Sequence, residues 1–128
     1  MTILLDTHAF LWFVWADPLL SRTARTIIED PANRKLLSVA SCWEIAIKAG
    51  NGKLTLGALT SVFIPRELAL NNIELLEVSL AHATAVESLP QHHRDPFDRL
   101  LISQALTDQL PIVSVDGVLD PYGITRIW

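Results

Sequence analysis

Cysteine and long apolar runs are both scarce in this chain of 128 residues. The single Cys42 cannot form an internal disulfide, which agrees with a reducing, cytoplasmic setting. The longest uninterrupted apolar run, 9–16, covers only eight residues, whereas a membrane-spanning helix needs about 20. The apolar N-terminus also lacks the basic segment of an export signal. We therefore expect a soluble, cytoplasmic protein with no membrane attachment.

Excess positive charge, Cys/His clusters and linkers are lacking as well. The net charge is −4, from 14 acidic and 10 basic residues, so the overall balance gives no sign of a basic nucleic-acid-binding patch. Any contact with nucleic acid must be local. No repeat, low-complexity segment or Pro/Gly/Ser-rich linker divides the chain. The sequence therefore predicts a single domain over residues 1–128.

Short apolar runs alternate with longer segments of helical period. The runs predict strands at 2–6, 35–40, 73–79, 111–116 and 125–128. Helices are expected from His8 to near Asp17, at 21–30, 41–50, 60–71 and 80–89, and from Asp95 onward, with a kink or restart at Pro65. Strands separated by helices pair in parallel. The predicted fold class is α/β, a sandwich with a central, mainly parallel sheet of four to five strands flanked by helices.

Two acidic residues stand at the ends of predicted strands. Asp6 is the last residue of the first strand, and Asp116 is the last residue of the fourth. The carboxyl ends of parallel strands meet at one edge of the sheet, where ligands bind in this fold class. We expect the two carboxylates to lie there together. Capping of the following helix is the alternative role for each residue, and either one alone leaves that alternative open.

Glu44 is a third candidate. It follows Ser41 by three residues, a spacing that also fits a capping box, in which the acid would bond to the serine backbone. Against this alternative, Glu44 shares a helical stripe with Lys48, and its neighbours Trp43 and Ile45 are apolar. A helix that is apolar nearly all round is expected to be buried nearly all round. Glu44 would then point inward, towards the strand ends.

The stretch "HHRDPFDRLLISQA" contains two more acids. Asp95 before Pro96 is a standard helix start, so capping accounts for most of its presence. Asp98 has no such role. It shares one face with Leu101 and Ile102, at spacings of three and four residues, and so belongs to the stripe that packs on the sheet. The helix dipole makes a negative charge tolerable in this first turn.

Four carboxylates gathered at one end of a sheet would repel one another, and a divalent cation would remove the conflict. Oxygen ligands suit Mg²⁺ or Mn²⁺, and the lack of a Cys/His cluster argues against zinc. Such ions commonly serve phosphoryl chemistry by activating water and polarising the phosphate. Three cationic side chains flank the acids in sequence and could contact a phosphate backbone, although solvated surface charge is the alternative for each of them: Lys48, Arg94 and Arg99.

Four segments together resemble a known family: "LLDTHAFLW", "SCWEIAIKAGNGKL", "LPQHHRDPFDRLLISQA" and "IVSVDGVLDPYGI". In order and spacing they are similar to the motifs of PIN-domain ribonucleases of the VapC toxin type, over Ile3 to Ile124. The resemblance implies a PIN-like sandwich. It also implies a Mg²⁺- or Mn²⁺-dependent endoribonuclease that acts on RNA, the toxin of a toxin–antitoxin pair, homodimeric and silenced by a cognate antitoxin protein.

The resemblance also assigns residues. The catalytic acids of the family fall on Asp6, Glu44, Asp98 and Asp116. We take Asp6, Asp98 and Asp116 as the metal ligands. Secondary positions fall on Asp95 and on Ser114, two residues before the last acid, and Thr7 could hydrogen-bond water at the metal, although a helix N-cap is its simpler role.

Histidines and aromatic residues near these motifs receive plainer interpretations. His92 and His93 are adjacent, so they rarely point at one target, and no third ligand stands at a metal-like spacing. His8 would pack or cap. The aromatic residues of the first helix are interpreted as core or subunit contacts rather than as stacking partners for RNA bases: Trp12, Phe13 and Trp15.

Two other functions remain as alternatives. A carboxylate phosphatase would use Asp6 as its nucleophile, but it usually needs a second acid where this chain has His8, and no lysine follows Lys53. A non-catalytic binding module would use the acids only as helix caps. The surplus acid Asp98 disfavours that interpretation.

Overall fold

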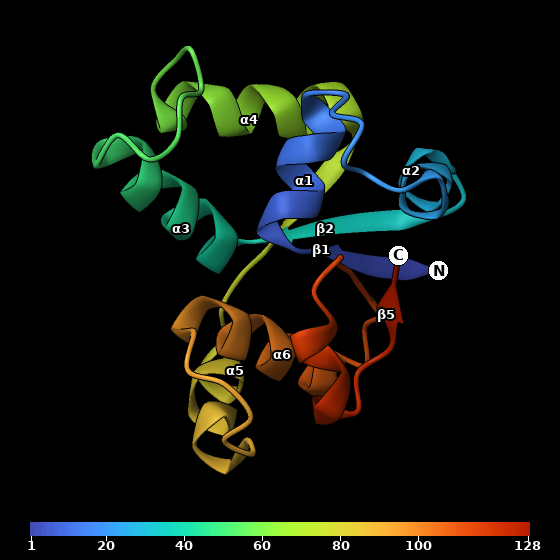
Figure 1. The fold of residues 1–128 in the computed structure, drawn as a ribbon, viewed down its shortest axis with the longest axis vertical. Helices are drawn as coiled ribbons and strands as arrows, with labels where there is room; N and C mark the ends of the chain where they lie inside the picture. The colour runs from blue at the N-terminus through green and yellow to red at the C-terminus, as the bar shows by residue number, and fades with distance from the viewer.

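The computed structural model describes all residues from 1 to 128 and contains one parallel sheet (Figure 1). Its five strands lie in the order β3-β2-β1-β4-β5, and every neighbouring pair is parallel. Their bounds are β1 Thr2–Leu5, β2 Arg34–Ser38, β3 Ile73–Leu76, β4 Ile112–Val113 and β5 Arg126–Ile127. The prediction of an α/β sandwich with a parallel sheet of four to five strands is confirmed.

Helices cover both faces of the sheet (Figure 1). One face carries α1 (Thr7–Val14), α2 (Arg22–Glu29), α3 (Val39–Gly50) and α4 (Thr60–Asn71). The other carries α6 (Pro96–Asp108) and the 3₁₀ helix η2 (Gly117–Tyr122), with α5 (Leu80–Ala85) and the 3₁₀ helix η1 (Val86–Ser88) packed against α6. No helix is long and apolar enough to cross a membrane.

Alternating side chains of the strands supply the two cores. Ile3 and Leu5 of β1 join the core under α1 to α4, whereas Leu4 joins the core under α6 and η2. All three are fully buried. Because successive strand residues point to opposite faces, a central strand with helices on both sides is apolar at every position. This explains the continuous run "ILL" in the sequence.

The strand order places a reversal beside β1. From β1 the chain builds outward through β2 to β3, and it then crosses to the other side of β1 to form β4 and β5. Crevices at such reversals, beyond the carboxyl ends of the strands, are the usual ligand sites of open α/β sheets. The ends of β1 and β4 therefore mark the place where ligands usually bind in folds of this class.

The start of α3 differs from the prediction. The strand expected over 35–40 ends at Ser38, and the helix begins at Val39 rather than after Ser41. Ser38 is the N-cap, and its Oγ accepts a hydrogen bond from the Ala40 amide at 3.0 Å. The Ser41 hydroxyl is buried and has no partner. Ser38 is both the last residue of β2 and the N-cap of α3, so the helix follows the strand without a linker.

Other bounds are shorter than expected. β3 ends at Leu76 instead of residue 79, β4 comprises only 112–113, and β5 only 126–127. The helix expected over 80–89 ends at Ala85 and continues as η1. In contrast, α4 runs through Pro65 as one helix, so the expected restart is wrong. Residues beyond the strand ends are needed for turns and caps, which apolar patterning does not reveal.

Burial of α3 also departs from the prediction. The helix was expected to be buried nearly all round, but Trp43 is 62% exposed and Ile47 is 42% exposed. Only one face, which includes Ala40, Glu44 and Ile45, is buried against the rest of the domain. An apolar side of α3 is therefore left open to solvent.

The corrected helix start gives a test of stability. We expect Ser38→Ala to lower the free energy of unfolding by about 1 kcal/mol, because it removes the cap of α3. The matched variant Ser41→Ala should change it by less than about 0.5 kcal/mol, since the Ser41 hydroxyl has no hydrogen bond to lose. Urea denaturation measures both. An equal or larger loss in Ser41→Ala would contradict this placement of the cap.

Candidate active site

An open pocket of about 430 Å³ lies beyond the carboxyl ends of β1 and β4. Segments far apart in the chain supply its walls. The lining residues are Asp6, Thr7, His8, Trp12, Glu44, Lys48, Asp95, Asp98, Val115 and Asp116. The structure therefore brings the four acids singled out from the sequence to one pocket, together with Asp95, Thr7 and Lys48.

Asp6 lies between β1, which ends at Leu5 rather than at Asp6 as predicted, and the start of α1. It is the N-cap of α1, and its Oδ1 accepts a hydrogen bond from the Ala9 amide at 2.7 Å. Its side chain is also buried. Burial raises the pKa of this carboxyl, while the Ser114 hydroxyl and the Ala9 amide oppose the rise. Capping and pocket lining, weighed as alternatives from the sequence, are both roles of this one residue.

Glu44 lies in the second turn of α3 and is buried at the pocket wall. Its Oε1 accepts a hydrogen bond from Thr7 Oγ1 at 2.6 Å, and its Oε2 accepts one from Lys48 Nζ at 2.7 Å. The capping box with Ser41 is absent because the helix begins before Ser41. Thr7 is not an N-cap either, since it is the first residue of α1 and its hydroxyl serves Glu44. Neighbouring side chains thus fix the Glu44 carboxylate on both sides.

Asp95 and Asp98 occupy the start of α6. Asp95 is the N-cap, and its Oδ1 accepts from the amides of Phe97 at 2.9 Å and Asp98 at 3.3 Å. Asp98 is in the first turn and its side chain is 30% exposed. Burial and the Asp95 charge raise the pKa of Asp98 to about 6, and His93 opposes the rise. The charges of Asp116 and Glu44 are smaller contributions to the same rise, so Asp98 senses the other acids of the pocket.

Asp116 differs in position from the prediction. β4 ends at Val113, so Asp116 follows the strand through Ser114 and Val115 instead of ending it, and it is exposed. It is the N-cap of η2, and its Oδ1 accepts from the Val118 amide at 3.1 Å. Ser114 is fully buried behind it, and its Oγ accepts from the Asp116 amide at 3.0 Å. Ser114 therefore holds the backbone that carries Asp116.

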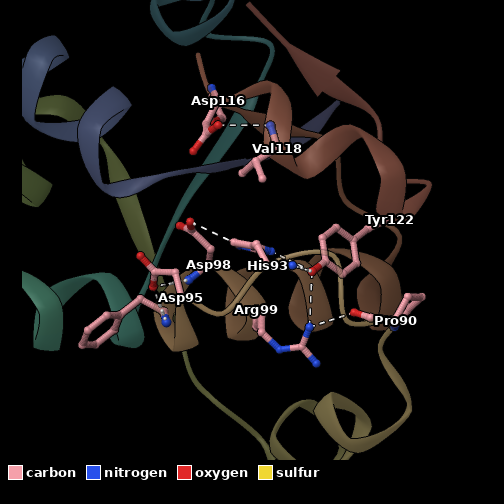
Figure 2. A network of polar contacts seen from close by, with 10 residues as sticks. Pro90, His93, Asp95, Asp98, Arg99, Asp116, Val118 and Tyr122 are labelled. Carbon is pink, nitrogen blue, oxygen red and sulfur yellow. Dashed lines mark hydrogen bonds and ion pairs between the residues drawn. The ribbon is translucent and has the colours of Figure 1, made fainter.

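Of the three cationic side chains, only Lys48 lies in the pocket. Arg94 is exposed just before α6 and lies outside the pocket lining. Arg99 is 7% exposed, so both interpretations from the sequence, phosphate contact and solvated surface charge, are wrong for this residue. Its guanidinium donates to the Pro90 carbonyl at 2.8 Å and to the Tyr122 hydroxyl at 3.2 Å (Figure 2). Backbone carbonyls that precede α6 accept hydrogen bonds from this charged group. The spacing of residues in the sequence could not predict these contacts.

One side chain near the acids was passed over from the sequence. His93 is half-buried, and its Nε2 lies 3.5 Å from Asp98 Oδ2 (Figure 2). Its Nδ1 lies 2.7 Å from the Tyr122 hydroxyl. Adjacent His92 is exposed and packs edge-on to the Tyr122 ring at 4.8 Å. Treating the two histidines as a pair hid their separate roles, because the loop before α6 has no periodicity that assigns their directions.

Comparison with known proteins places this pocket in a family. A sequence model described as PIN domain matches residues 3–123. The chain belongs to the PIN domain family. PIN domains are generally nucleases. No protein of curated function matches the chain significantly in sequence.

Two solved structures share the fold of this PIN domain. One is VapBC2 from Rickettsia felis, solved bound to a DNA fragment from its promoter, with a TM-score of 0.72 and 12% identity over 98% of this chain and 97% of that chain. The other is FitAcB from Neisseria gonorrhoeae, with a TM-score of 0.63 and 18% identity over 98% of this chain and 96% of that chain. At these identities the likeness shows the fold alone.

The donor atoms of this pocket suit a hard cation, but the distances between its acids are too long for a metal site. Its donors are carboxylate oxygens, which suit Mg²⁺ and Mn²⁺. However, no group of three His, Cys, Asp or Glu side chains lies close enough together to hold a metal ion. Glu44 already has both oxygens bonded to protein partners, whereas Asp98 accepts no hydrogen bond from the backbone. Asp6, Asp98 and Asp116 are the acids that such an ion would draw together.

Ionisation of Asp98 should destabilise the metal-free protein, because burial and the neighbouring acids disfavour its charged form. Since the folded-state pKa of Asp98 is raised to about 6, its contribution to stability should be fully present below pH 4 and be lost as the pH rises through 6. We expect Asp98→Asn to raise the free energy of unfolding at pH 7.5 by about 1 kcal/mol, allowing for the partial solvent exposure of the side chain. At pH 4 the gain should nearly vanish. Urea denaturation in a chelator measures this difference, and an equal effect at both pH values would contradict it.

The buried Arg99 gives a second stability test. We expect Arg99→Ala to lower the free energy of unfolding by about 2 to 4 kcal/mol, because the Pro90 carbonyl and the Tyr122 hydroxyl lose a charged donor in a buried site. Arg94→Ala is the matched control and should stay within about 0.5 kcal/mol. Thermal or urea unfolding decides the point. Similar stability of the two variants would show that Arg99 is not structural.

Proposed function

We propose that this PIN domain is a Mg²⁺- or Mn²⁺-dependent endoribonuclease, the toxin of a toxin–antitoxin pair. The observation that carries the proposal is the convergence of Asp6, Glu44, Asp98 and Asp116 on one open pocket at the reversal of strand order. They arrive from four separate segments. Burial is the main cause of the raised pKa of Asp98, and the charges of Asp95, Asp116 and Glu44 add to the rise. Helix capping accounts for Asp6 and Asp116, but it gives no structural reason for Asp98.

We assign roles by the contacts that each acid has. Asp6, Asp98 and Asp116 would hold the cation, which when bound polarises a phosphate and lowers the pKa of water. Glu44, whose carboxylate Thr7 and Lys48 hold, would orient the attacking water. Asp95 keeps the start of α6 in place and adds negative charge beside Asp98. Ser114 supports Asp116 through its backbone.

RNA would be bound by a small number of local contacts. Lys48 is half-exposed at the pocket wall and Arg94 is exposed near the start of α6, so both can approach a phosphate. The net charge of −4 offers no general attraction to a polyanion. We therefore expect the protein to bind RNA weakly when no cation is present.

A protein partner would complete the toxin role. VapBC2 and FitAcB are two solved structures that share the fold. A groove of about 580 Å³ runs between α3 and the start of α4, and it includes Leu54, Leu56 and Leu59. Exposed Trp43 and Ile47 lie on α3. We propose a cognate antitoxin as the partner that covers such apolar surface. The homodimer and the cytoplasmic location stay predictions.

A non-catalytic binding module is the second candidate, and one observation favours it. Asp6, Asp95 and Asp116 each cap a helix, which is a sufficient structural reason for three of the acids. This candidate predicts that Mn²⁺ added to the protein produces no binding heat and no change in melting temperature. The nuclease proposal predicts both.

Cleavage of RNA is the direct test. With Mg²⁺ or Mn²⁺ present, we expect the protein to cut single-stranded RNA, and Asp6→Asn and Asp98→Asn to reduce the rate by about 100-fold or more. Glu87→Gln is the matched control, because Glu87 is exposed and lies outside the pocket. Gel analysis of end-labelled RNA measures the rates. Cleavage that persists in a chelator or in both Asn variants would refute the proposal.

A further inference from the structure

We propose that His93 is a positioning residue for Asp98: Tyr122 holds the imidazole in one tautomer, and the ring presents its Nε2–H to the Asp98 carboxylate. This inference rests on the proposed function, because it concerns an acid of the same pocket. Figure 2 shows the row of side chains that carries it, from Arg99 through Tyr122 and His93 to Asp98.

Hydrogen-bond accounting at the Tyr122 hydroxyl fixes the tautomer. Arg99 Nη1 donates to this oxygen at 3.2 Å, and the backbone N–H of His93 donates to it at 3.2 Å. A hydroxyl has two acceptor lone pairs and one proton, so both lone pairs are used. The proton must then go to the third neighbour, His93 Nδ1, at 2.7 Å. Nδ1 is therefore the acceptor, and a neutral ring carries its hydrogen on Nε2.

The other ring nitrogen of His93, Nε2, faces Asp98. It is buried and has no hydrogen-bond partner in the structure. It faces Asp98 Oδ2 at 3.5 Å, slightly beyond good hydrogen-bond distance. A buried N–H without a partner is costly, and the cost ends if Asp98 moves a few tenths of an ångström towards it. The ring therefore favours one position of the carboxylate.

The anchor of this row is rigid. Arg99 and Tyr122 are both buried, and Arg99 also donates to the Pro90 carbonyl, so the loop before α6 is tied at its start and near its end. Tyr122 is the last residue of η2, the helix that Asp116 caps. The same contacts therefore connect the segment that carries Asp98 with the segment that carries Asp116.

A loop contact alone would predict something different. If His93 only tied the loop to Tyr122, any side chain that kept the Nδ1 contact would suffice. Asparagine extends to the Nδ1 position but not to Nε2, whereas glutamine places an N–H near the Nε2 position. His93→Asn and His93→Gln are thus a matched pair that separates the loop contact from the contact with Asp98.

The tautomer and the carboxylate can be read by NMR without any cation or RNA. At pH 8 we expect the ¹⁵N shifts of wild-type His93 to show a protonated Nε2 and an unprotonated Nδ1, and this preference to be lost in Tyr122→Phe. The ¹³Cγ signal of Asp98 should shift in His93→Asn and return towards the wild-type value in His93→Gln. A proton on Nδ1, or an Asp98 signal that ignores His93→Asn, would overturn the inference.

Kinetics then connect the contact to activity. We expect His93→Asn to lower kcat for RNA cleavage about tenfold with little change in KM, and His93→Gln to retain most of it. Equal loss in the two variants would overturn the positioning role. If the wild-type protein cut no RNA while the NMR results held, the proposed function would fail and the contact between His93 and Asp98 would stand.

Discussion

The parallel pairing of β1 with β4 is the constraint on which the site depends. Leu4 pairs with Ile112 and Leu5 with Val113, and the Asp6 amide donates to the Val113 carbonyl at 3.1 Å. This last bond sets Asp6 beside the residue where the chain leaves β4, and Ser114 follows immediately. The Ser114 hydroxyl then acts on both acids, through the Asp116 amide and through its effect on the Asp6 carboxyl. A slip of one residue in this register would turn the side chains that follow β1 and β4 towards opposite faces of the sheet.

Two acids of the site are helix caps that also line the pocket. One carboxylate oxygen of Asp6 and of Asp116 accepts a hydrogen bond from the backbone, and the other is free to face the pocket. Asp98 has no such compensation, and it has a pKa near 6, which expresses the cost of its position. The favourable caps offset part of the repulsion in the metal-free protein.

The sequence predicted the layers, the parallel sheet and the acids that line the pocket, because apolar runs, helical stripes and strand ends leave local patterns. It misplaced the start of α3, because Ser41 fitted the N-cap pattern whereas Ser38, the last residue of β2, caps the helix. It also misjudged Arg99 and gave His93 no role in the site. Arg99 bonds to a carbonyl nine residues earlier and to Tyr122, 23 residues later, whereas His93 contacts Tyr122 29 residues later. Contacts of that kind arise from the fold and have no sequence period.

The shortness of β4 determines which wall of the pocket can yield. Asp6 and Asp98 are fixed to α1 and α6, whose apolar sides are buried in the two cores. Asp116 instead follows a strand of two residues, is exposed, and begins a short 3₁₀ helix whose Leu119 and Tyr122 are buried in the second core. Of the three segments, the one that carries Asp116 has the shortest regular element next to its acid. An ion that draws the acids together would therefore displace Asp116 more than Asp6 or Asp98.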